Sequence, residues 1–374
     1  MHAGPQQMLA AIRERVWVTA GRNIAKQIVH QCVKCFRAAP KEINPIMANL
    51  PLARVQPSFP FQTTGVDYAG PLHIRDRKGR GFKTSKAYIC IFICFVTKAV
   101  HIELVTSLCT EAFILALRRF IARKGKPNNI YSDNGTCFVG AKSEVKELQN
   151  FLSASKNIIS DKMSNEEINW HFIPPRSPHF GGLWEASVRS CKHHLKRVAG
   201  NASLTYEEMY SLLVQIEAIM NSRPMSPMSS DPNDLNPLTS AHFMIGRSMV
   251  AAPDPDVLGI PEGILSLFQR IQQLNQHFWK RWSREYITEL QQRTKWRAQG
   301  RNLEKGAMVL VKEDNLPTLL WRIGRVVEVY PGPDGINRVA VIKTINGNIK
   351  RGFAKICPLP ICANTTTSTD SEVI

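Results

Sequence analysis

The chain has 374 residues, of which 44% are hydrophobic, and its 48 Lys and Arg side chains outnumber 30 Asp and Glu, giving a formal net charge of +18. This length predicts roughly two to four domains, and this composition excludes a collagen, a mostly disordered chain and a disulfide-rich miniprotein. The longest apolar run, Ala87–Val96, is about half a membrane span, so no membrane-spanning segment is predicted.

The positive charge is concentrated in the two flanks of the chain. The net charge is +6 in residues 1–60, +4 in residues 61–269 and +10 in residues 270–356. A nearly balanced middle between basic flanks predicts a catalytic domain with two nucleic-acid-binding modules. The alternative is that these charges only keep ordinary surfaces soluble.

The first two thirds of the chain predict helices, a linker and then an α/β domain. Leu9, Ile12 and Val16 share a helical face, which predicts helix within residues 7–38. Five prolines between residues 39 and 62 predict an extended linker. Beyond the linker, the pattern predicts strands at 62–68, 86–96, 99–105, 129–132 and 169–173, and helices at 110–122, 143–152, 183–198 and 205–220. This order of elements predicts a mixed sheet with helices packed on it.

The last third predicts a connector, a long helix and a small β domain. Seven prolines between residues 224 and 261 indicate an irregular connector, and an amphipathic basic helix is expected at 264–297. Short β runs at 308–312, 323–329 and 338–344, separated by turn residues, predict a small barrel. The Thr- and Ser-rich tail, 361–374, is expected to be disordered.

Three carboxylates stand in contexts that suggest a metal site. Asp67 lies in or at the end of the first apolar strand, Asp133 ends a short strand, and Glu185 begins a helix after Gly181 and Gly182. A strand Asp, a strand-end Asp and a helix Glu can converge at one edge of a mixed sheet. Hard oxygen ligands without Cys or His favour Mg²⁺ or Mn²⁺, and two such ions can promote phosphodiester chemistry.

The helix after Glu185 carries a cationic stripe. Arg189, Lys192 and Lys196 follow Glu185 at helical spacing, which would place DNA phosphates beside the metal ions. A plainer interpretation is also open. In it, Asp133 is part of an ordinary turn, Asp67 caps a strand and Glu185 pairs with Arg189.

Three segments resemble the catalytic blocks of retroelement integrases. They are Pro60-Phe-Gln-Thr-Thr-Gly-Val-Asp-Tyr-Ala-Gly-Pro71, Ile130-Tyr-Ser-Asp-Asn-Gly-Thr-Cys-Phe138 and Trp170-His-Phe-Ile-Pro-Pro-Arg-Ser-Pro-His-Phe-Gly-Gly-Leu-Trp-Glu185, with Asn221-Ser-Arg-Pro224 downstream. Their sequences are most similar to those of the BEL/Pao class of LTR retrotransposons, within the retroviral-type DDE integrase family. The resemblance runs from His2 to about Pro360, and the interval between Asp133 and Glu185 exceeds that of retroviral integrases.

The resemblance implies a multidomain architecture. Its centre, residues 60–225, would be a ribonuclease-H-like core with a mixed five-stranded sheet, and Asp67, Asp133 and Glu185 would be the catalytic, metal-binding triad. A partial helical zinc-binding domain at 1–40 and a linker at 41–59 would precede it. The connector and basic helix at 226–300 would follow it, and then a basic β-barrel at 301–360.

The N-terminal domain of this family binds zinc through two His and two Cys. His2, Cys32 and Cys35 match three of these ligands, and the first His of the pattern would precede His2. Structural zinc needs four ligands, so the site is incomplete. We therefore expect a truncated start, with Met1 an internal methionine of a longer polyprotein.

The implied partner is DNA, both the ends of the element and the target. Candidate phosphate contacts are Arg189, Lys192 and Lys196 in the core, and Lys312, Arg322, Arg325, Lys343, Lys350 and Arg351 in the barrel. Joining two DNA ends implies a homo-oligomer, and a chromosomal target implies a nuclear location. No membrane association is expected.

The implied activity is that of a polynucleotidyl transferase. Water would nick each DNA end to leave a 3′-hydroxyl, and that hydroxyl would attack a target phosphodiester without a covalent enzyme intermediate. Two alternatives stay open. The chain could be a decayed or domesticated DNA-binding remnant, or a ribonuclease-H-fold nuclease that cuts without joining.

Overall fold

The computed structural model describes residues 4–34, 51–79, 81–154, 168–173, 182–199, 202, 204–229, 231, 233–250, 254–291, 303–313, 316–331 and 337–359. Within them, the helical stretches 147–154 and 182–189 are described by their backbone alone. Contacts divide the chain into two units, Met1–Pro51 and Leu52–Ile374, and each is described by itself.

The first unit contains two short helices. Helix α1 spans Pro5–Arg13 and helix α2 spans Gly21–Gln31. Proline is well suited to the start of α1, because its missing N–H would have no helical partner there. Leu9 of α1 and Ala25 of α2 are buried and form the small contact between the helices. Helical structure was predicted within residues 7–38 in two segments, which correspond to α1 and α2.

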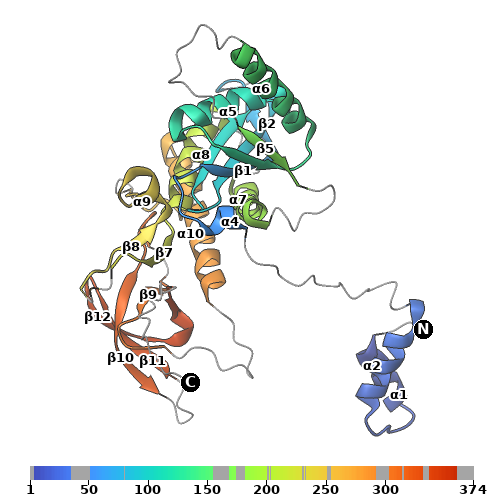
Figure 1. Ribbon diagram of the computed structural model, residues 1–374. Coiled ribbons are helices and arrows are strands. Elements are labelled where there is room, and N and C mark those ends of the chain that lie inside the picture. The colour runs from blue at the N-terminus through green and yellow to red at the C-terminus, as the bar shows by residue number, and fades with distance from the viewer. Residues whose placement is uncertain are drawn as a thin grey trace, which may run out of the picture. The chain divides into compact units, whose positions relative to one another are not determined.

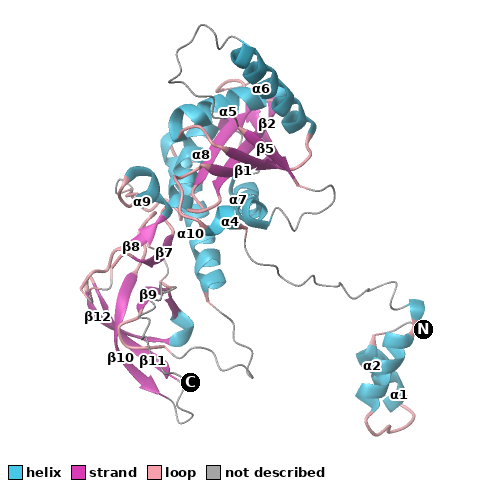
Figure 2. Ribbon diagram, viewed as in Figure 1, coloured by secondary structure: helices cyan, strands magenta, loops and turns pink. Residues whose placement is uncertain are grey.

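The second unit begins with the short helix α4 (Leu52–Val55) and is built on a mixed sheet (Figures 1 and 2). Strands β1 (Thr63–Arg75), β2 (Thr84–Cys94) and β3 (Val100–Val105) form an antiparallel meander. Strands β4 (Asn129–Ser132) and β5 (Asn169–Phe172) extend it in parallel, giving the order β3-β2-β1-β4-β5. The short β6 (Leu204–Thr205) also pairs with β1, so the sheet has six strands.

Helices cover both faces of this sheet (Figure 1). One face packs on α5 (Thr110–Lys124) and α6 (Thr136–Ala154) through aromatic residues that include Phe92, Phe113, Phe120 and Phe138. The other packs on α7 (Gly182–Ala199), α8 (Tyr206–Asn221) and α10 (Leu267–Leu290), with a largely aliphatic core. The two faces are called here the α5 face and the α7 face.

The proline-rich connector holds regular elements that the sequence pattern did not predict. Strands β7 (Pro224–Pro227) and β8 (Pro237–Thr239) form an antiparallel pair, and the six-residue helix α9 (Ser240–Ile245) follows. Such short strands tolerate proline, because only part of the strand backbone needs a hydrogen-bonding partner.

The C-terminal region is a five-stranded antiparallel sheet. It contains β9 (Met308–Val311), β10 (Ile323–Pro331), β11 (Asn337–Thr344), β12 (Gly347–Gly352), the 3₁₀ turn η2 (Phe353–Lys355) and β13 (Ile356–Pro358). The strand order is β12-β11-β10-β9-β13. Within the described strands, β12 and β13 lie at opposite ends without pairing, so the predicted barrel closure is not confirmed.

The sheet also packs against α10. Ile287 of that helix is buried with Met308, Leu310, Cys357 and Leu359. The predicted α/β class and mixed sheet are confirmed, as is the C-terminal β region. None of the described helices is long and apolar enough to cross a membrane.

Candidate active site

Asp67 lies in the middle of β1, half-buried, and faces the α7 side of the sheet. Its neighbours Val66 and Tyr68 pack on the α5 face, where the Tyr68 ring stacks 5.3 Å from that of Phe138. Ala69 packs in the core of the α7 face. Because side chains alternate along a strand, Asp67 shares the α7 face with Ala69.

Strand pairing brings Asp133 level with Asp67. In the parallel pair of β1 and β4, Gly65 is opposite Tyr131. Continuing this pairing by two residues sets Asp67 opposite Asp133, on neighbouring strands about 4.8 Å apart. Tyr131 packs against the core of the α7 face, and Asp133 follows directly after the end of β4.

Local hydrogen bonds fix the turn that carries Asp133. Its Oδ1 accepts a hydrogen bond from the Gly135 N–H at 3.0 Å. Asn134 donates from Nδ2 to the Ile173 carbonyl at 2.8 Å and so ties the turn to the end of β5. Asp133 is exposed. The turn interpretation of Asp-Asn-Gly is thus correct, and it is compatible with an exposed carboxylate at a strand end.

The burial of Tyr68 removes one candidate base from this region. Desolvation raises the pKa of its hydroxyl, with the nearby Cys90 as the next cause. The group therefore stays protonated at neutral pH, and it lies on the α5 face, away from Asp67.

Helix α7 carries Glu185 in its first turn and packs against β1. Ala199 is the last residue of α7. Five residues later, Leu204 pairs with Ile74 of β1. The helix rises about 21 Å over the 14 residues from Glu185 to Ala199. Strand β1 rises about 23 Å over the seven residues from Asp67 to Ile74. The helical stretch and the strand stretch thus have similar lengths. The Glu185 side chain itself lies outside the described atoms.

The predicted cationic stripe on α7 is only partly described. Lys192 and Lys196 are exposed, whereas the Arg189 side chain lies outside the described atoms. The opposite side of the helix is apolar, with Cys191 and Leu195 buried in the core of the α7 face. Positions 192 and 196 share a helical stripe with position 185, as the 3.6-residue period requires.

A close polar contact that the sequence pattern did not indicate joins α7 to α10. Glu285 of α10 lies 2.6 Å from His194 Nε2 and accepts a hydrogen bond from Ser190 Oγ at 3.2 Å. Burial lowers the pKa of His194, although the carboxylate of Glu285 opposes this effect. His193 and His194 are adjacent in sequence, and only His194 is buried. The helical period of α7 was the signal that could have separated them.

The predicted DNA contacts of the C-terminal sheet occupy different environments. Arg322 is half-buried and pairs with Glu313 at 3.2 Å, and Lys312 is also half-buried. Lys343 and Lys350 are exposed. Arg325 differs from the expectation of a surface contact, because it is buried.

Three backbone carbonyls satisfy the buried Arg325. Its guanidinium donates to Ser229 O at 3.0 Å, to Gly306 O at 3.1 Å and to Asp234 O at 3.3 Å. A guanidinium that is enclosed in this way holds chain segments together instead of facing a phosphate.

The described atoms include only some of the predicted metal-binding residues. Among the described residues, no group of three His, Cys, Asp or Glu side chains could hold a metal ion. His2 and Cys35 lie outside the described residues, and Cys32 is the C-cap residue of α2. The incomplete zinc site and the carboxylate triad therefore stay predictions.

Comparison with known proteins gives a family match over part of the chain and matches among solved structures. Residues 266–359 match DUF5641, a family of unknown function, over α10 and the whole C-terminal sheet. A simian T-cell lymphotropic virus intasome, solved by cryo-electron microscopy in complex with a PP2A regulatory subunit, matches with 14% identity and a TM-score of 0.36. That match covers 96% of each chain, but its low TM-score does not establish a shared fold. No curated protein matches the chain.

Proposed function

We propose that this chain is a metal-dependent polynucleotidyl transferase of the retroelement integrase type, acting on DNA. One observation carries the proposal: Asp67 lies on β1, and Asp133 directly follows β4, the parallel neighbour of β1. Helix α7, which carries Glu185 in its first turn, packs on the α7 face of the sheet. Two carboxylates at one level of a sheet, with a third carboxylate on the covering helix, suit phosphodiester chemistry.

The strand order supports a ribonuclease-H-like core. Three antiparallel strands, β1 to β3, are followed by two parallel strands, β4 and β5, with helices on both faces. This is the arrangement expected for the core of an integrase, with the first carboxylate on the central strand β1 and the second just after β4. The motif segments quoted from the sequence coincide with these positions.

Asp67, Asp133 and Glu185 are the residues that would hold Mg²⁺ or Mn²⁺. Carboxylate oxygens are the ligands these ions prefer, and the exposed Asp133 is accessible to solvent. When bound, the ions would polarise the phosphodiester and stabilise the charge on the attacking and leaving oxygens. The chain itself fixes the carboxylates through β1, the Asp133 turn and α7. Zinc in the N-terminal unit, held by His2, Cys32 and Cys35, is a separate proposal.

The DNA would lie along the exposed side of α7. Lys192 and Lys196 are exposed and offer phosphate contacts beside the carboxylates, with Arg189 earlier on the same helix. Joining two DNA ends requires a homo-oligomer, and a chromosomal target requires nuclear entry. Both follow from the proposed reaction.

The test is strand exchange on a branched oligonucleotide that mimics the joined product. The full chain is incubated with it in Mn²⁺ or Mg²⁺, beside Asp133→Asn and Glu185→Gln. We expect release and resealing by the wild type and a loss of at least about 1,000-fold in either variant. Asp256→Asn is the matched control, because Asp256 is also exposed and also accepts a turn hydrogen bond, from the Leu258 N–H at 3.0 Å.

The outcomes separate the candidate functions. Full activity in Asp133→Asn or Glu185→Gln would refute the carboxylate assignment. Cleavage without resealing would favour a nuclease, and DNA binding without any strand exchange would favour a DNA-binding remnant.

A further inference from the structure

Four consecutive residues, Asn221-Ser-Arg-Pro224, lie where helix α8 ends and strand β7 begins. The proposed chemistry uses none of them, although the segment accompanies the motifs that resemble those of integrases. All four are buried, and each makes a hydrogen bond to a different segment of the second unit. We call residues 221–224 the joint.

The first residue of the joint holds the edge of the mixed sheet. Among the described strands, β3 is the last one on its side of that sheet. The Asn221 side chain occupies the free edge of β3: Oδ1 accepts from the Val100 N–H at 2.8 Å, and Nδ2 donates to the Val100 carbonyl at 2.7 Å. One amide thus makes the pair of hydrogen bonds that a residue of a further strand would make.

The third residue of the joint is a buried cation. Arg223 donates to the carbonyl of Lys98, in the turn that leads into β3, and to the Met220 carbonyl at 3.0 Å. Its burial lowers the pKa of the guanidinium, and the nearby Tyr286 opposes this shift. A guanidinium that bonds to two carbonyls through its planar fork fixes the direction of both chain segments.

The other two residues of the joint hold α10 and the C-terminal sheet. The Ser222 hydroxyl accepts from Trp321 Nε1 at 3.3 Å, and the Pro224 carbonyl accepts from the Tyr286 hydroxyl at 2.6 Å. The rings of Trp321 and Tyr286 also pack together, with centroids 5.6 Å apart. Trp321 lies two residues before β10 begins at Ile323, so the joint reaches both α10 and the entry to the C-terminal sheet.

Helix α10 continues this connection to the helix of the proposed active site. Glu285, next to Tyr286, lies 2.6 Å from His194 Nε2 and accepts a hydrogen bond from Ser190 Oγ at 3.2 Å. Both partners belong to α7, which carries Glu185 in its first turn. A displacement of α10 would therefore be transmitted to α7 as well as to the C-terminal sheet.

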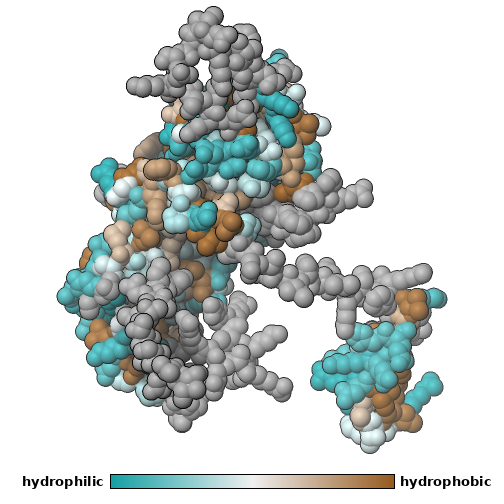
Figure 3. Space-filling model, viewed as in Figure 1, coloured by the Kyte–Doolittle hydropathy of each residue, from teal (hydrophilic) through white to brown (hydrophobic). Residues whose placement is uncertain are grey.

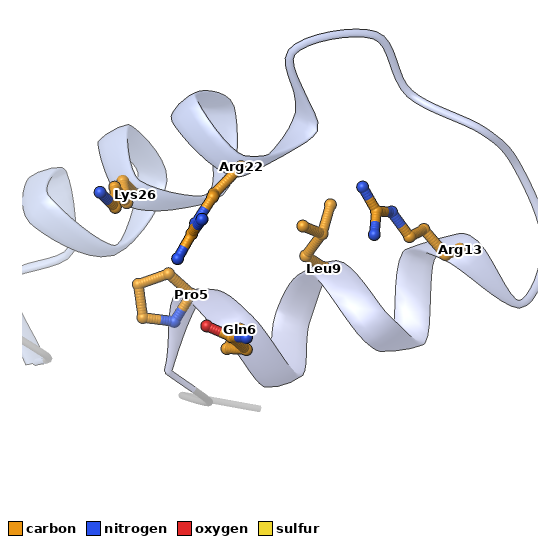
Figure 4. Close-up of a pocket in the computed structure, with 6 residues that line it drawn as sticks. All are labelled: Pro5, Gln6, Leu9, Arg13, Arg22 and Lys26. Carbon is orange, nitrogen blue, oxygen red and sulfur yellow. The ribbon is translucent and has the colours of Figure 1, made fainter. Parts of the chain in front are cut away.

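The joint is built from contacts between protein segments. Asn221, Ser222 and Arg223 are at most 7% exposed, and their polar groups bond to other parts of the chain. The cavity in Figure 4 has a different character: it lies between α1 and α2 of the first unit, has a volume of about 310 Å³ and is lined by exposed cations. Hydrophilic residues gather over one side of that unit (Figure 3).

We propose that the joint positions the C-terminal sheet and α10 relative to the sheet that bears Asp67, so that DNA held by the one region meets the carboxylates of the other. The residues of the joint are positioning residues, because they touch neither DNA nor metal. The inference rests on the proposed function for its DNA and its carboxylates. A small misplacement of reacting groups slows a reaction strongly even when binding is retained, so the joint should affect turnover more than affinity.

The test uses the full chain and a variant that loosens the joint without removing a buried charge. Ser222→Ala/Tyr286→Phe removes both hydroxyls on the C-terminal side of the joint and keeps the aromatic rings. The matched control is Ser211→Ala/Tyr330→Phe, which also removes two hydroxyls. Those hydroxyls bond only locally, within α8 at 2.9 Å and within β10 at 2.8 Å.

A distance measurement reports on the joint without any reaction. Spin labels on noncanonical residues replace Glu207 of α8 and Asn348 of β12, which are both exposed, and pulsed electron paramagnetic resonance measures the distance between them. We expect a narrow distance distribution in the wild type and in the control, and a broader one in the joint variant. An unchanged width in the joint variant would overturn the proposal, whether or not the chain is active.

Strand exchange on the branched oligonucleotide then tests the positioning role. We expect kcat of the joint variant to fall about 10-fold, with KM and the salt dependence of DNA affinity unchanged, because alignment is lost and phosphate contacts are kept. An equal fall of kcat in the control, or a change confined to KM, would overturn this role. If the wild type shows no strand exchange, the proposed function fails, and the distance measurement still decides whether the joint holds the C-terminal sheet.

Discussion

His101 lies between two glutamates inside the α/β core. Its imidazole is 3.0 Å from Glu103 and 3.1 Å from Glu217, and all three side chains are largely buried. Arg119 and Arg123 complete the cluster from α5, at 2.6 Å and 3.0 Å from Glu103. The cluster joins β3, α5 and α8, and it lies apart from the proposed carboxylate site.

The ionisation of this cluster sets a pH range for stability. Burial by itself lowers the pKa of His101, but hydrogen bonds to Glu103 and Glu217 outweigh it and raise the pKa above 6.5. Burial by itself raises the pKa of Glu103, and its bonds to His101 and Arg119 lower it below 4.5. The His101 contribution is thus lost as pH rises past its folded pKa, and the glutamate contribution as pH falls below 4.5.

Substituting His101 should therefore be costly and should change the pH profile. We expect His101→Gln to lower the free energy of unfolding by about 3–5 kcal/mol near pH 6, because two buried carboxylates lose their shared partner. The wild type should lose stability from pH 6 to pH 8 and the variant should not. Urea unfolding at both pH values measures this. His73→Gln, an exposed histidine on β1, serves as the control, and an equal loss there would contradict the prediction.

At the scale of elements, α8 shows how a local sequence signal determines a helix start. Thr205 Oγ1 accepts from the Glu208 N–H at 3.4 Å, and Glu208 Oε2 accepts from the Thr205 N–H at 3.0 Å. Glu208 also contacts Arg75 of β1 at 3.4 Å. These two bonds form a capping box, and the contact with Arg75 links the helix start to the central strand.

Removing this cap tests how far a local signal stabilises the core. Thr205→Ala should lower the free energy of unfolding by about 1 kcal/mol, because the Glu208 N–H loses its acceptor. Thermal unfolding followed by circular dichroism measures the change. Glu207→Ala, an exposed position in the same turn, is the comparison, and it should not match the loss in Thr205→Ala.

At the scale of the whole second unit, Trp321 and Arg325 add to the packing of Ile287 in docking the C-terminal region on the core. Trp321 lies within an aromatic cluster of α10, with ring centroids 4.9 Å from Trp279 and 6.0 Å from Trp282. Its Nε1 also donates to Ser222 Oγ at 3.3 Å. Buried Arg325 adds bonds to carbonyls of the connector. The tryptophans of α10 thus serve to pack the C-terminal region on the core.

Arg325→Lys distinguishes docking from DNA contact. The variant keeps the charge but loses the planar fork that reaches three carbonyls, so stability should fall by about 1.5–3 kcal/mol. The salt dependence of DNA affinity should stay unchanged, because no phosphate contact is lost. Chemical unfolding and DNA titration measure the two quantities. Arg338→Lys, at an exposed position, is the control. A changed salt dependence in Arg325→Lys with normal stability would show instead that Arg325 contacts DNA at the surface.

The sequence by itself determined the local elements and the candidate carboxylates. The predicted strand 129–132 has the bounds of β4, and the other core helices and strands agree within several residues. The largest differences are the end of β1 and the start of α6. Local hydrogen bonds and hydrophobic periods are read within a few residues, and this explains the agreement. Short elements such as β6, β7 and β13 were missed because non-local pairing, not their own pattern, makes them strands.

The tertiary structure alone decided which residues meet. Parallel pairing of β1 with β4 brings Asp67 and Asp133 onto neighbouring segments of the sheet, although 66 positions of sequence separate them and no local pattern spans that interval. Packing also buried Arg325, although no local sequence feature distinguishes it from the exposed Lys343. In both cases the deciding energies come from contacts between segments distant in the chain, and these exist only after the sheet and helices have assembled.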